Sequence, residues 1–497
     1  MDAITRIDRT QKEISVLQGI IELLEWDEET MMSHDAVLGR SDQIALLEGL
    51  VHKRFNSPEL KGALRSVRQH DLLPHERIVL RVLRREVERR SRIPTDLVER
   101  LAEESVTATH LWKQARKDKD FKVFLPSLKK LIALRQRYAR RLDDTKSPFI
   151  VLVQENEPDL SEQRIVHLMK VLRRGLSDLL SRVRSSPSYS KDLSHIKLDK
   201  KLYNAFLSQV LSDIGVPSRR THISSSMHPF TSLVSRNDVR ITSRSTTRIE
   251  RFFDIIHEAG HALYDLGLPQ QYYHTLVYQG ASLGLHESQS TFWEHFVGKN
   301  EHFWRHYYSS LSPAFLEPVS FDDFSLSINR VAPGAIRMDA DELTYGLHII
   351  IRYDIERGLI EGTIDPKDAS RLWNVKMKEY LGVDVRHDAE GILQDIHWAD
   401  GDFGYFPTYL IGLVYASQIY HHLKTELPGF SRGIRQGRFV EMLAWLRENI
   451  HRKGRSMSAE QVMRAACGKG LDPQVFLDYL EDKYSGIYRL TGKAASH

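Results

Sequence analysis

The sequence contains a single cysteine, Cys467, among 497 residues. One thiol excludes a disulfide framework, a cysteine-rich zinc finger and an iron–sulfur cluster. It fits a reducing compartment, in which thiols stay free. If the protein binds a metal, the ligands must therefore come from its 23 histidines and its carboxylates.

The chain also lacks long apolar runs and an excess of one charge. No stretch reaches the ~18 apolar residues that a membrane span needs, and the first twenty residues lack the continuous apolar segment of an export signal. The 70 basic and 66 acidic residues leave a formal charge of only +4. Arginines at 77–92 alternate with glutamates, which favours a solvated helix face. These features predict a cytoplasmic protein that binds neither membranes nor nucleic acid.

Helical periodicity is what the sequence has in abundance, as in the spacing of Leu80, Leu83 and Val87. Alternation around Val239 and Ile241 predicts a strand within residues 215–250, which could pair with an extended peptide. We therefore expect a mainly α fold with a small β-sheet. At about 100–200 residues per domain the length allows about three domains. We interpret residues 1–497 as one domain with a helical part (about 1–215) and a catalytic part (about 216–497).

Residues 257–261 read His-Glu-Ala-Gly-His, the H-E-x-x-H pattern. Positions i and i+4 share one helical face, so His257 and His261 can converge on one metal ion. Glu258 lies beside the ion rather than on it, where it can take a proton from a water that the metal activates. Apolar neighbours favour a buried helix, and Gly267 and Pro269 predict its end.

The residues after the motif decide between two kinds of zinc site. A metzincin would place glycine and histidine at the third and sixth positions after His261, where this chain has Tyr264 and Gly267. The other solution takes a glutamate from a following helix. Glu287 lies on a helix predicted to start near residue 281 and to end near residue 298, and we favour it as the third ligand.

Four other residues near this site have open roles. Glu294 lies two turns after Glu287 on the same predicted face, and His286 would be the ligand if the helix were rotated by about 100°. Asp265 and Gln289 are candidates for orienting a ligand from behind. Each of the last two is equally well explained as an ordinary helix residue.

Several motifs together resemble the thermostable carboxypeptidase Taq family of metallocarboxypeptidases. The matching segments are Trp26–Met32, His228–Phe230, Asp238–Thr242, His257–His261, His286–Gln289, Ile336–Asp341 and Gly391–Trp398. They occur in family order and extend over nearly the whole chain. One departure is at 231–237, where the family usually has a glycine-rich loop.

The resemblance implies a saddle-like, multi-helix body of the neurolysin type, with a deep central groove and the metal at its floor. It implies Zn²⁺ or Co²⁺, one ion per subunit, and a homodimer. It also implies that single residues are released from peptides with a free C-terminus. We therefore expect His257, His261 and Glu287 to hold the ion.

Peptide hydrolysis by this route has further requirements. Glu258 would deprotonate the water and later protonate the leaving amine. The oxyanion needs a hydrogen-bond donor besides the metal, and the candidates are Tyr405, Tyr409 and His397. For each tyrosine, core packing is the alternative explanation.

An exopeptidase must also bind a free carboxylate, for which arginine offers a bidentate pair. Arg352 ranks narrowly first, before Arg240 and Arg337. Its alternative explanation is a structural salt bridge with Asp354 or Glu356. His228 could lie beside the groove, and Asp238 could orient Arg240 or a neighbouring loop.

The residues considered so far are also compatible with two other functions. A metallo-oligopeptidase would cut internal bonds with the same metal site but without a carboxylate clamp. A non-catalytic peptide-binding protein could keep the fold, although Glu258 is not needed to bind metal and so argues for catalysis.

Overall fold

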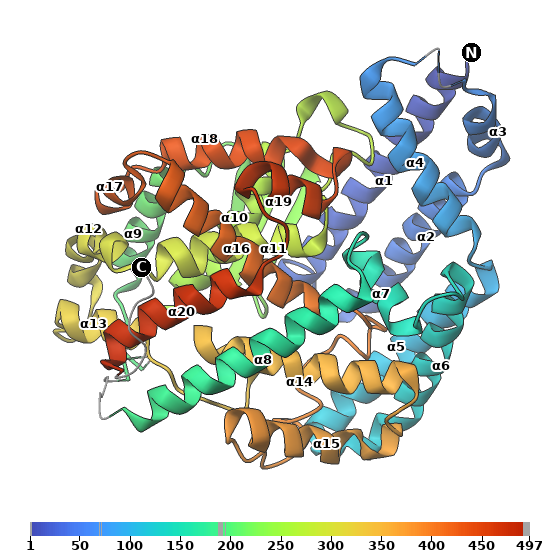
Figure 1. The fold of residues 1–497 in the computed structure, drawn as a ribbon. Coiled ribbons are helices and arrows are strands. Elements are labelled where there is room, and N and C mark those ends of the chain that lie inside the picture. Colours follow the sequence, from blue (N-terminus) through green and yellow to red (C-terminus); the bar gives the residue numbers. More distant parts are fainter. Residues whose placement is uncertain (1, 69, 71, 187–191, 194, 491–497) are drawn as a thin grey trace. The chain divides into compact units, whose positions relative to one another are not determined.

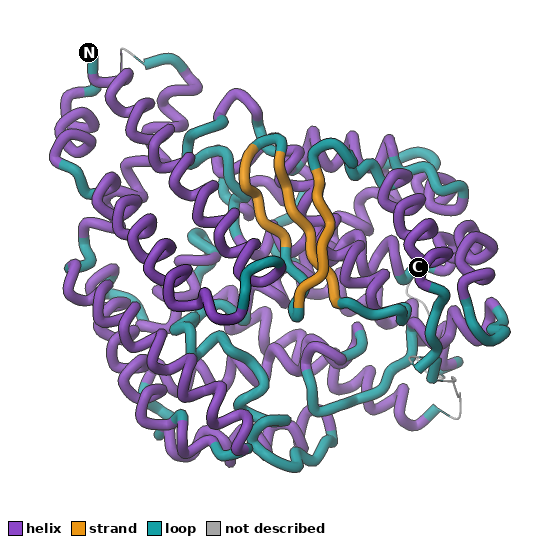
Figure 2. The backbone as a smooth tube through the Cα atoms, turned by 180° about the vertical axis from the view of Figure 1, so that it is seen from behind, coloured by secondary structure: helices purple, strands orange, loops and turns teal. Residues whose placement is uncertain are grey.

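The computed structural model describes residues 2–68, 70, 72–186, 192–193 and 195–490. These residues form a mainly helical fold with one three-stranded sheet, which confirms the expected fold class at that level (Figures 1 and 2). The chain divides into two compact units, each assembled from three stretches. The first unit contains Met1–Ser91, Asp192–Ser325 and Ile419–Gly470, and the second contains Arg92–Lys191, Leu326–Gln418 and Leu471–His497.

The first unit carries the sheet and the helices around it. Its elements are α1 (Ala3–Thr30), α2 (Val37–Phe55), α3 (Pro58–Ser66), α4 (Pro74–Ser91), α9 (Lys200–Asp213), β1 (Thr221–Ser226), β2 (Thr231–Ser235), β3 (Asp238–Arg244), α10 (Glu250–Gly267), α11 (Leu283–Thr291), a π-helical turn (Phe292–Gly298), α12 (Glu301–Leu311), α17 (Phe430–Arg435), α18 (Val440–Asn449) and α19 (Ala459–Cys467).

The second unit is helical in its described residues. Its elements are α5 (Thr95–Asp118), α6 (Leu125–Leu142), α7 (Pro148–Asn156), α8 (Glu162–Ser185), α14 (Glu342–Glu361), α15 (Ala369–Lys376), a π-helical turn (Met377–Leu381) and α20 (Pro473–Tyr488). Two further helices contain residues of both units: α13 (Phe321–Ile328) and α16 (Pro407–Glu426). Short 3-10 turns are His34–Ala36, Phe121–Val123, Gln270–Tyr272, Ser312–Ala314, Arg337–Asp339, Pro366–Asp368 and His451–Ser456.

The sheet has the order β1-β3-β2, with β1 parallel and β2 antiparallel to the central strand β3 (Figure 2, orange). The predicted strand is the central one, and its Val239 and Ile241 are fully buried. Helix α10 packs against β3 and β2, and α1 packs against β2 and β1. Gly19 allows α1 to approach closely, because a Cβ there would lie 2.4 Å from the carbonyl oxygen of Val234.

Helix α10 contains the H-E-x-x-H pattern and ends at Gly267, as its glycine and proline predict. It crosses α11 at Gly260, where a Cβ would lie 2.5 Å from the carbonyl oxygen of Gln289 and 2.6 Å from the Cα of Ser290. The two backbones are therefore in direct contact. A glycine between the two histidines is what allows the following helix to lie this close.

Helix α11 does not continue as a regular helix to residue 298, because it changes to a π-helical turn at Phe292. A π turn adds about one residue to the turn and so rotates every later side chain relative to an α-helix. The sequence pattern does not show this change.

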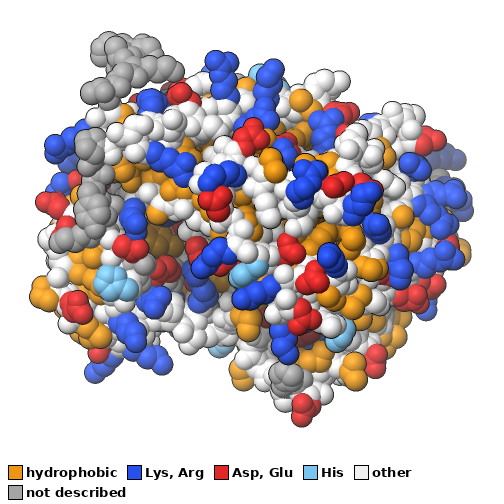
Figure 3. All heavy atoms as spheres, turned by 90° about the horizontal axis from the view of Figure 1, so that it is seen from below, with side chains coloured by type: hydrophobic (Ala, Val, Ile, Leu, Met, Phe, Trp, Pro, Cys, Tyr) orange, Lys and Arg blue, Asp and Glu red, His pale blue; other side chains and the backbone are white. Residues whose placement is uncertain are grey.

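The arginines of α4 are used inside the first unit. Arg84 donates to the backbone carbonyl of Leu64, 3.0 Å away, and Arg89 and Arg90 bond to Glu86. On the face drawn in Figure 3, basic and acidic side chains are interspersed among apolar ones. Among the described residues, no helix combines the length and apolarity needed to cross a membrane.

We predict that Gly260→Ala destabilises the protein by about 1–3 kcal/mol, because the added methyl group cannot fit between the two backbones. The same variant should bind metal more weakly, since the crossing places Glu287 opposite the two histidines. Thermal unfolding and a chelator competition measure these effects. Gly62→Ala in α3 is the control: nothing lies within 4 Å of a Cβ there, so it should be neutral or slightly stabilising. Equal behaviour of the two variants would contradict the packing argument.

Candidate metal centre and charged cluster

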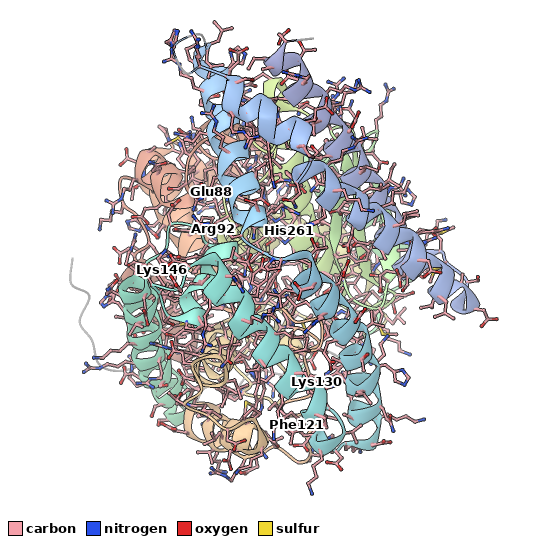
Figure 4. All side chains as sticks on the ribbon, turned by 90° about the vertical axis from the view of Figure 1, so that its right-hand side faces the viewer. Glu88, Arg92, Phe121, Lys130, Lys146 and His261 are labelled. Carbon is pink, nitrogen blue, oxygen red and sulfur yellow. The ribbon has the colours of Figure 1, made fainter. Side chains whose placement is uncertain are left out.

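Three side chains predicted to hold a metal lie together in the first unit: His257, His261 and Glu287. Their ligand atoms all lie within 4.8 Å of one another. His257 Nε2 is 3.8 Å from one carboxylate oxygen of Glu287, and His261 Nε2 is 3.5 Å from the other. His261 is labelled in Figure 4.

This donor set fits a divalent metal. Two imidazole nitrogens and one carboxylate oxygen are the ligands of a His₂Glu zinc site. Each side chain is only 12–24% exposed, so most of the water that would compete for the ligands is excluded. In both His257 and His261 the nitrogen that faces Glu287 is Nε2. The Nδ1 atom of each ring therefore points away from Glu287.

Glu294 acts on the outer side of His257. Its Oε2 lies 2.8 Å from His257 Nδ1, so a ring that loses one proton on metal binding would keep the other on Nδ1 and offer the lone pair of Nε2 to the ion. From the sequence, Glu294 was an alternative to Glu287 as the third ligand. The π turn instead directs it to the back of the first histidine, while Lys299 Nζ lies 3.8 Å from its other oxygen.

The carboxylates dominate the charge of this centre. Burial alone would lower the pKa of His257, but Glu287 and Glu294 outweigh it and raise that pKa to about 10. Burial lowers the pKa of His261 to about 4. Glu287 and Glu294 thus favour positive charge at His257, and a divalent cation would be stabilised in the same environment.

Glu258 is 6% exposed and lies on the same helix. Burial raises its pKa to about 7. Its carboxylate accepts a hydrogen bond from Thr231 Oγ1 at 2.7 Å. No pattern in the sequence pointed to Thr231, because strand pairing and helix packing bring it to Glu258 from 27 residues away.

The other residues considered beside the motif have different partners. His286 stacks on His261 with ring centroids 4.4 Å apart and bonds to Asp265 Oδ1 at 3.1 Å. It is not part of the ligand cluster, and Asp265 contacts it rather than a ligand. Gln289 bonds to the buried His451 at 3.0 Å.

The first unit also contains the predicted residues Asp238, Arg240 and His228. Arg240 pairs with Asp238 through two hydrogen bonds, of 3.2 and 3.1 Å, and lies over the ring of Trp26. His228 is exposed, and its carbonyl oxygen accepts a bond from Ser226. The Arg240 side chain keeps 20% of its surface exposed.

A second group of predicted residues lies in the second unit, around Asp395. This carboxylate bonds to Arg337 Nε at 2.9 Å through one oxygen and to Arg352 Nε at 2.6 Å through the other. The two guanidiniums hold the pKa of Asp395 far below its usual range against the effect of burial. Asp395 belongs to the Gly391–Trp398 motif, but its spacing alone predicted no role for it.

Arg352 is fully buried, and its Nη1 donates to the carbonyl oxygen of His348 at 2.8 Å. The expected alternative, a salt bridge with Asp354 or Glu356, is not what the structure shows. Asp354 bonds to Lys376 at 2.8 Å. Such complete enclosure does not suit the residue that we ranked first for binding a substrate carboxylate.

Glu356 is a buried carboxylate that accepts bonds from Trp398 Nε1 at 2.7 Å and from the backbone N–H of Gly404 at 2.6 Å. Burial raises its pKa to about 8. It anchors the loop that leads to Tyr405 and α16. At neutral pH this carboxyl is mostly uncharged.

The predicted oxyanion donors lie together in the second unit. His397 Nε2 is 3.1 Å from the hydroxyl of Tyr409, and the rings of Tyr405 and Tyr409 are 5.3 Å apart. Burial lowers the pKa of His397 to about 4, so this ring is neutral at physiological pH.

Comparison with known proteins gives one consistent result. The carboxypeptidase Taq (M32) metallopeptidase family matches residues 6–484. Carboxypeptidase 1 of Bacillus subtilis is 33% identical over 488 residues, which cover 96% of this chain and 97% of that protein. Thermostable carboxypeptidase 1 of Pyrococcus furiosus is 33% identical over 470 residues, covering 93% and 94%.

Solved structures superimpose on nearly the whole chain. The M32 carboxypeptidase from Deinococcus radiodurans superimposes with a TM-score of 0.93 at 30% identity, covering 98% of this chain and 99% of that one. Trypanosoma cruzi metallocarboxypeptidase 1 gives a TM-score of 0.92 at 31% identity, covering 97% and 99%.

We predict that Glu294→Gln weakens metal binding by about 10- to 100-fold, because the amide keeps a hydrogen-bond acceptor for His257 but removes its negative charge. Competition with a chelator measures the affinity without any assay of activity. Glu301→Gln, at an exposed pair with Arg305 on α12, is the matched control and should bind metal as the unaltered protein does. An unchanged affinity in the Glu294 variant would contradict the orienting role.

Proposed function

Because the chain belongs to the carboxypeptidase Taq (M32) metallopeptidase family and is a metal-dependent carboxypeptidase, we propose that His257, His261 and Glu287 hold its metal and that Glu258 is its general base. The convergence of the three ligand atoms within 4.8 Å carries this assignment. A divalent metal held there would polarise the scissile carbonyl and acidify the attacking water. We propose zinc as the ion, one per subunit, with cobalt as the alternative.

Glu258 has the features that its role needs. Its position next to His257 in sequence keeps it beside the ligands rather than among them, and burial places its pKa near neutrality. It can therefore take a proton from the attacking water and pass it to the leaving amine. Tyr405, Tyr409 and His397 are the proposed donors to the oxyanion.

For the substrate carboxylate we propose Arg337, ahead of Arg240 and Arg352. Arg337 and Arg352 share the single charge of Asp395, so one positive charge remains uncompensated in a buried cluster. His397 adds no charge because its ring is neutral, and Glu356 removes little because its pKa is about 8. Arg240, by contrast, is neutralised by Asp238. Arg337 is the less buried member of the cluster, with 7% of its side chain exposed against none for Arg352.

The remaining expectations stay proposals. We propose that residues 1–497 act as one catalytic domain with a saddle-like body of the neurolysin type and a deep groove for peptides. His228 and Asp238 are proposed to lie beside the bound peptide. We also propose a cytoplasmic homodimer. The family resemblance supports the body, the groove and the dimer, and the single cysteine fits a reducing compartment.

Glu258→Gln should lower kcat by about 10²- to 10⁴-fold with the metal retained, because the amide cannot accept the proton. Release of the C-terminal residue from a short peptide and metal analysis of the same sample measure the two quantities. Glu250→Gln, two turns earlier on α10, is the control and should leave kcat within about twofold. Undiminished turnover in the Glu258 variant with metal bound would remove the base assignment.

Amidation of the peptide C-terminus should reduce kcat/KM by about 10²-fold or more, because the guanidinium loses its charged partner.

Arg337→Gln should raise KM for the free peptide and leave cleavage of the amide unchanged. Arg352→Gln should instead lower thermal stability, since it leaves Asp395 underpaired in the interior. Equal rates for the free and amidated peptides would support an oligopeptidase without a clamp, and the same KM effect in Arg240→Gln alone would transfer the role to Arg240.

A further inference from the structure

Thr231 is the first residue of β2 and contacts Glu258 at two points. Its Oγ1 lies 2.7 Å from the carboxylate oxygen Oε2 and 3.0 Å from the backbone carbonyl oxygen of the same glutamate. The side chain of Thr231 is half-buried and that of Glu258 is 6% exposed. A single hydroxyl therefore lies within hydrogen-bond distance of both the carboxylate and the backbone carbonyl oxygen of the proposed base.

The backbone around Thr231 is held from two sides. The fully buried Thr242 on β3 accepts a bond from the N–H of Phe230 through its Oγ1, and its own N–H donates to the carbonyl oxygen of Phe230, both at 2.9 Å. Further along β2, the carbonyl oxygen of Val234 lies against Gly19 of α1. The hydroxyl thus approaches Glu258 from a fixed backbone position.

A threonine hydroxyl has one hydrogen to donate. The ionised carboxylate of Glu258 is a stronger acceptor than its backbone carbonyl oxygen, so the hydroxyl donates to Oε2. That bond fixes the plane of the carboxylate and leaves its other oxygen for the proton of the attacking water. The carbonyl oxygen 3.0 Å away keeps the hydroxyl close to this residue.

We propose that Thr231 is a positioning residue that holds the Glu258 carboxylate in the orientation from which its other oxygen takes the proton of the attacking water. This rests on the proposed role of Glu258. The hydroxyl acts through Glu258, so its loss affects turnover rather than metal binding or substrate binding.

The experiment compares Thr231→Val with Thr231→Ser in the metal-loaded protein. Valine keeps the shape and suits a strand but lacks the hydroxyl, and kcat should fall by about tenfold to a hundredfold with KM within about twofold and metal content unchanged. Serine restores the hydroxyl, and kcat should return to within about threefold. A Thr231→Val kcat within twofold of the unaltered protein overturns the proposal, as does a serine variant no better than valine.

Thr221→Val on β1 is the matched control. It makes the same substitution in the same sheet, and among the described residues its buried hydroxyl has no hydrogen-bond partner. It should leave kcat unchanged, and a loss equal to that of Thr231→Val would show a general effect on the sheet and overturn the proposal. If Thr231→Val fails to fold, Thr231→Ala and Thr231→Ser supply the same comparison.

A double variant separates this inference from the proposed function. If Thr231 acts only through Glu258, adding Thr231→Val to Glu258→Gln should cause no more than about a twofold further loss in the residual kcat. A further loss as large as in the single variant overturns the positioning role while the base role stands. Full turnover in Glu258→Gln alone would instead reject the base assignment, on which the inference rests.

Discussion

The contact between the backbones of α10 and α11 at Gly260 is the constraint from which the metal centre follows. Helical spacing alone places His257 and His261 on one face of α10, but it supplies only two ligands. The third comes from α11, and its carboxylate can reach both imidazoles only because no Cβ separates the helices. The π turn then follows directly, and it determines that the next glutamate reaches the back of His257.

Sequence periodicity captured what depends on neighbours along the chain. The shared face of the two histidines, the end of α10 at Gly267 and the strand at Val239 are local features, and each was predictable from residue spacing. The mainly helical fold and the family were equally accessible, because ordered motifs extend over most of the sequence. Glu287 as third ligand depended on a helix being antiparallel and close, which spacing allowed but did not require.

The features that the sequence did not predict arise from tertiary packing. Arg352 has Asp354 and Glu356 within one turn, yet it pairs with Asp395, 43 residues further along the chain. Glu356 instead accepts two N–H groups from a loop. Thr231 reaches Glu258 because a strand and a helix meet. In each case the partner is selected by burial, since a buried polar group must find whichever complementary group the fold brings close.

The two clusters favour charges of opposite sign. Around His257 the carboxylates Glu287 and Glu294 favour positive charge, so a divalent metal would be stabilised there. Around Asp395 two guanidiniums share one carboxylate, so the cluster is stabilised by an added anion. The role proposed for Arg337 follows from the charge of this second cluster: amidation of a peptide C-terminus removes the negative charge that a guanidinium binds, whatever the side chain of the last residue.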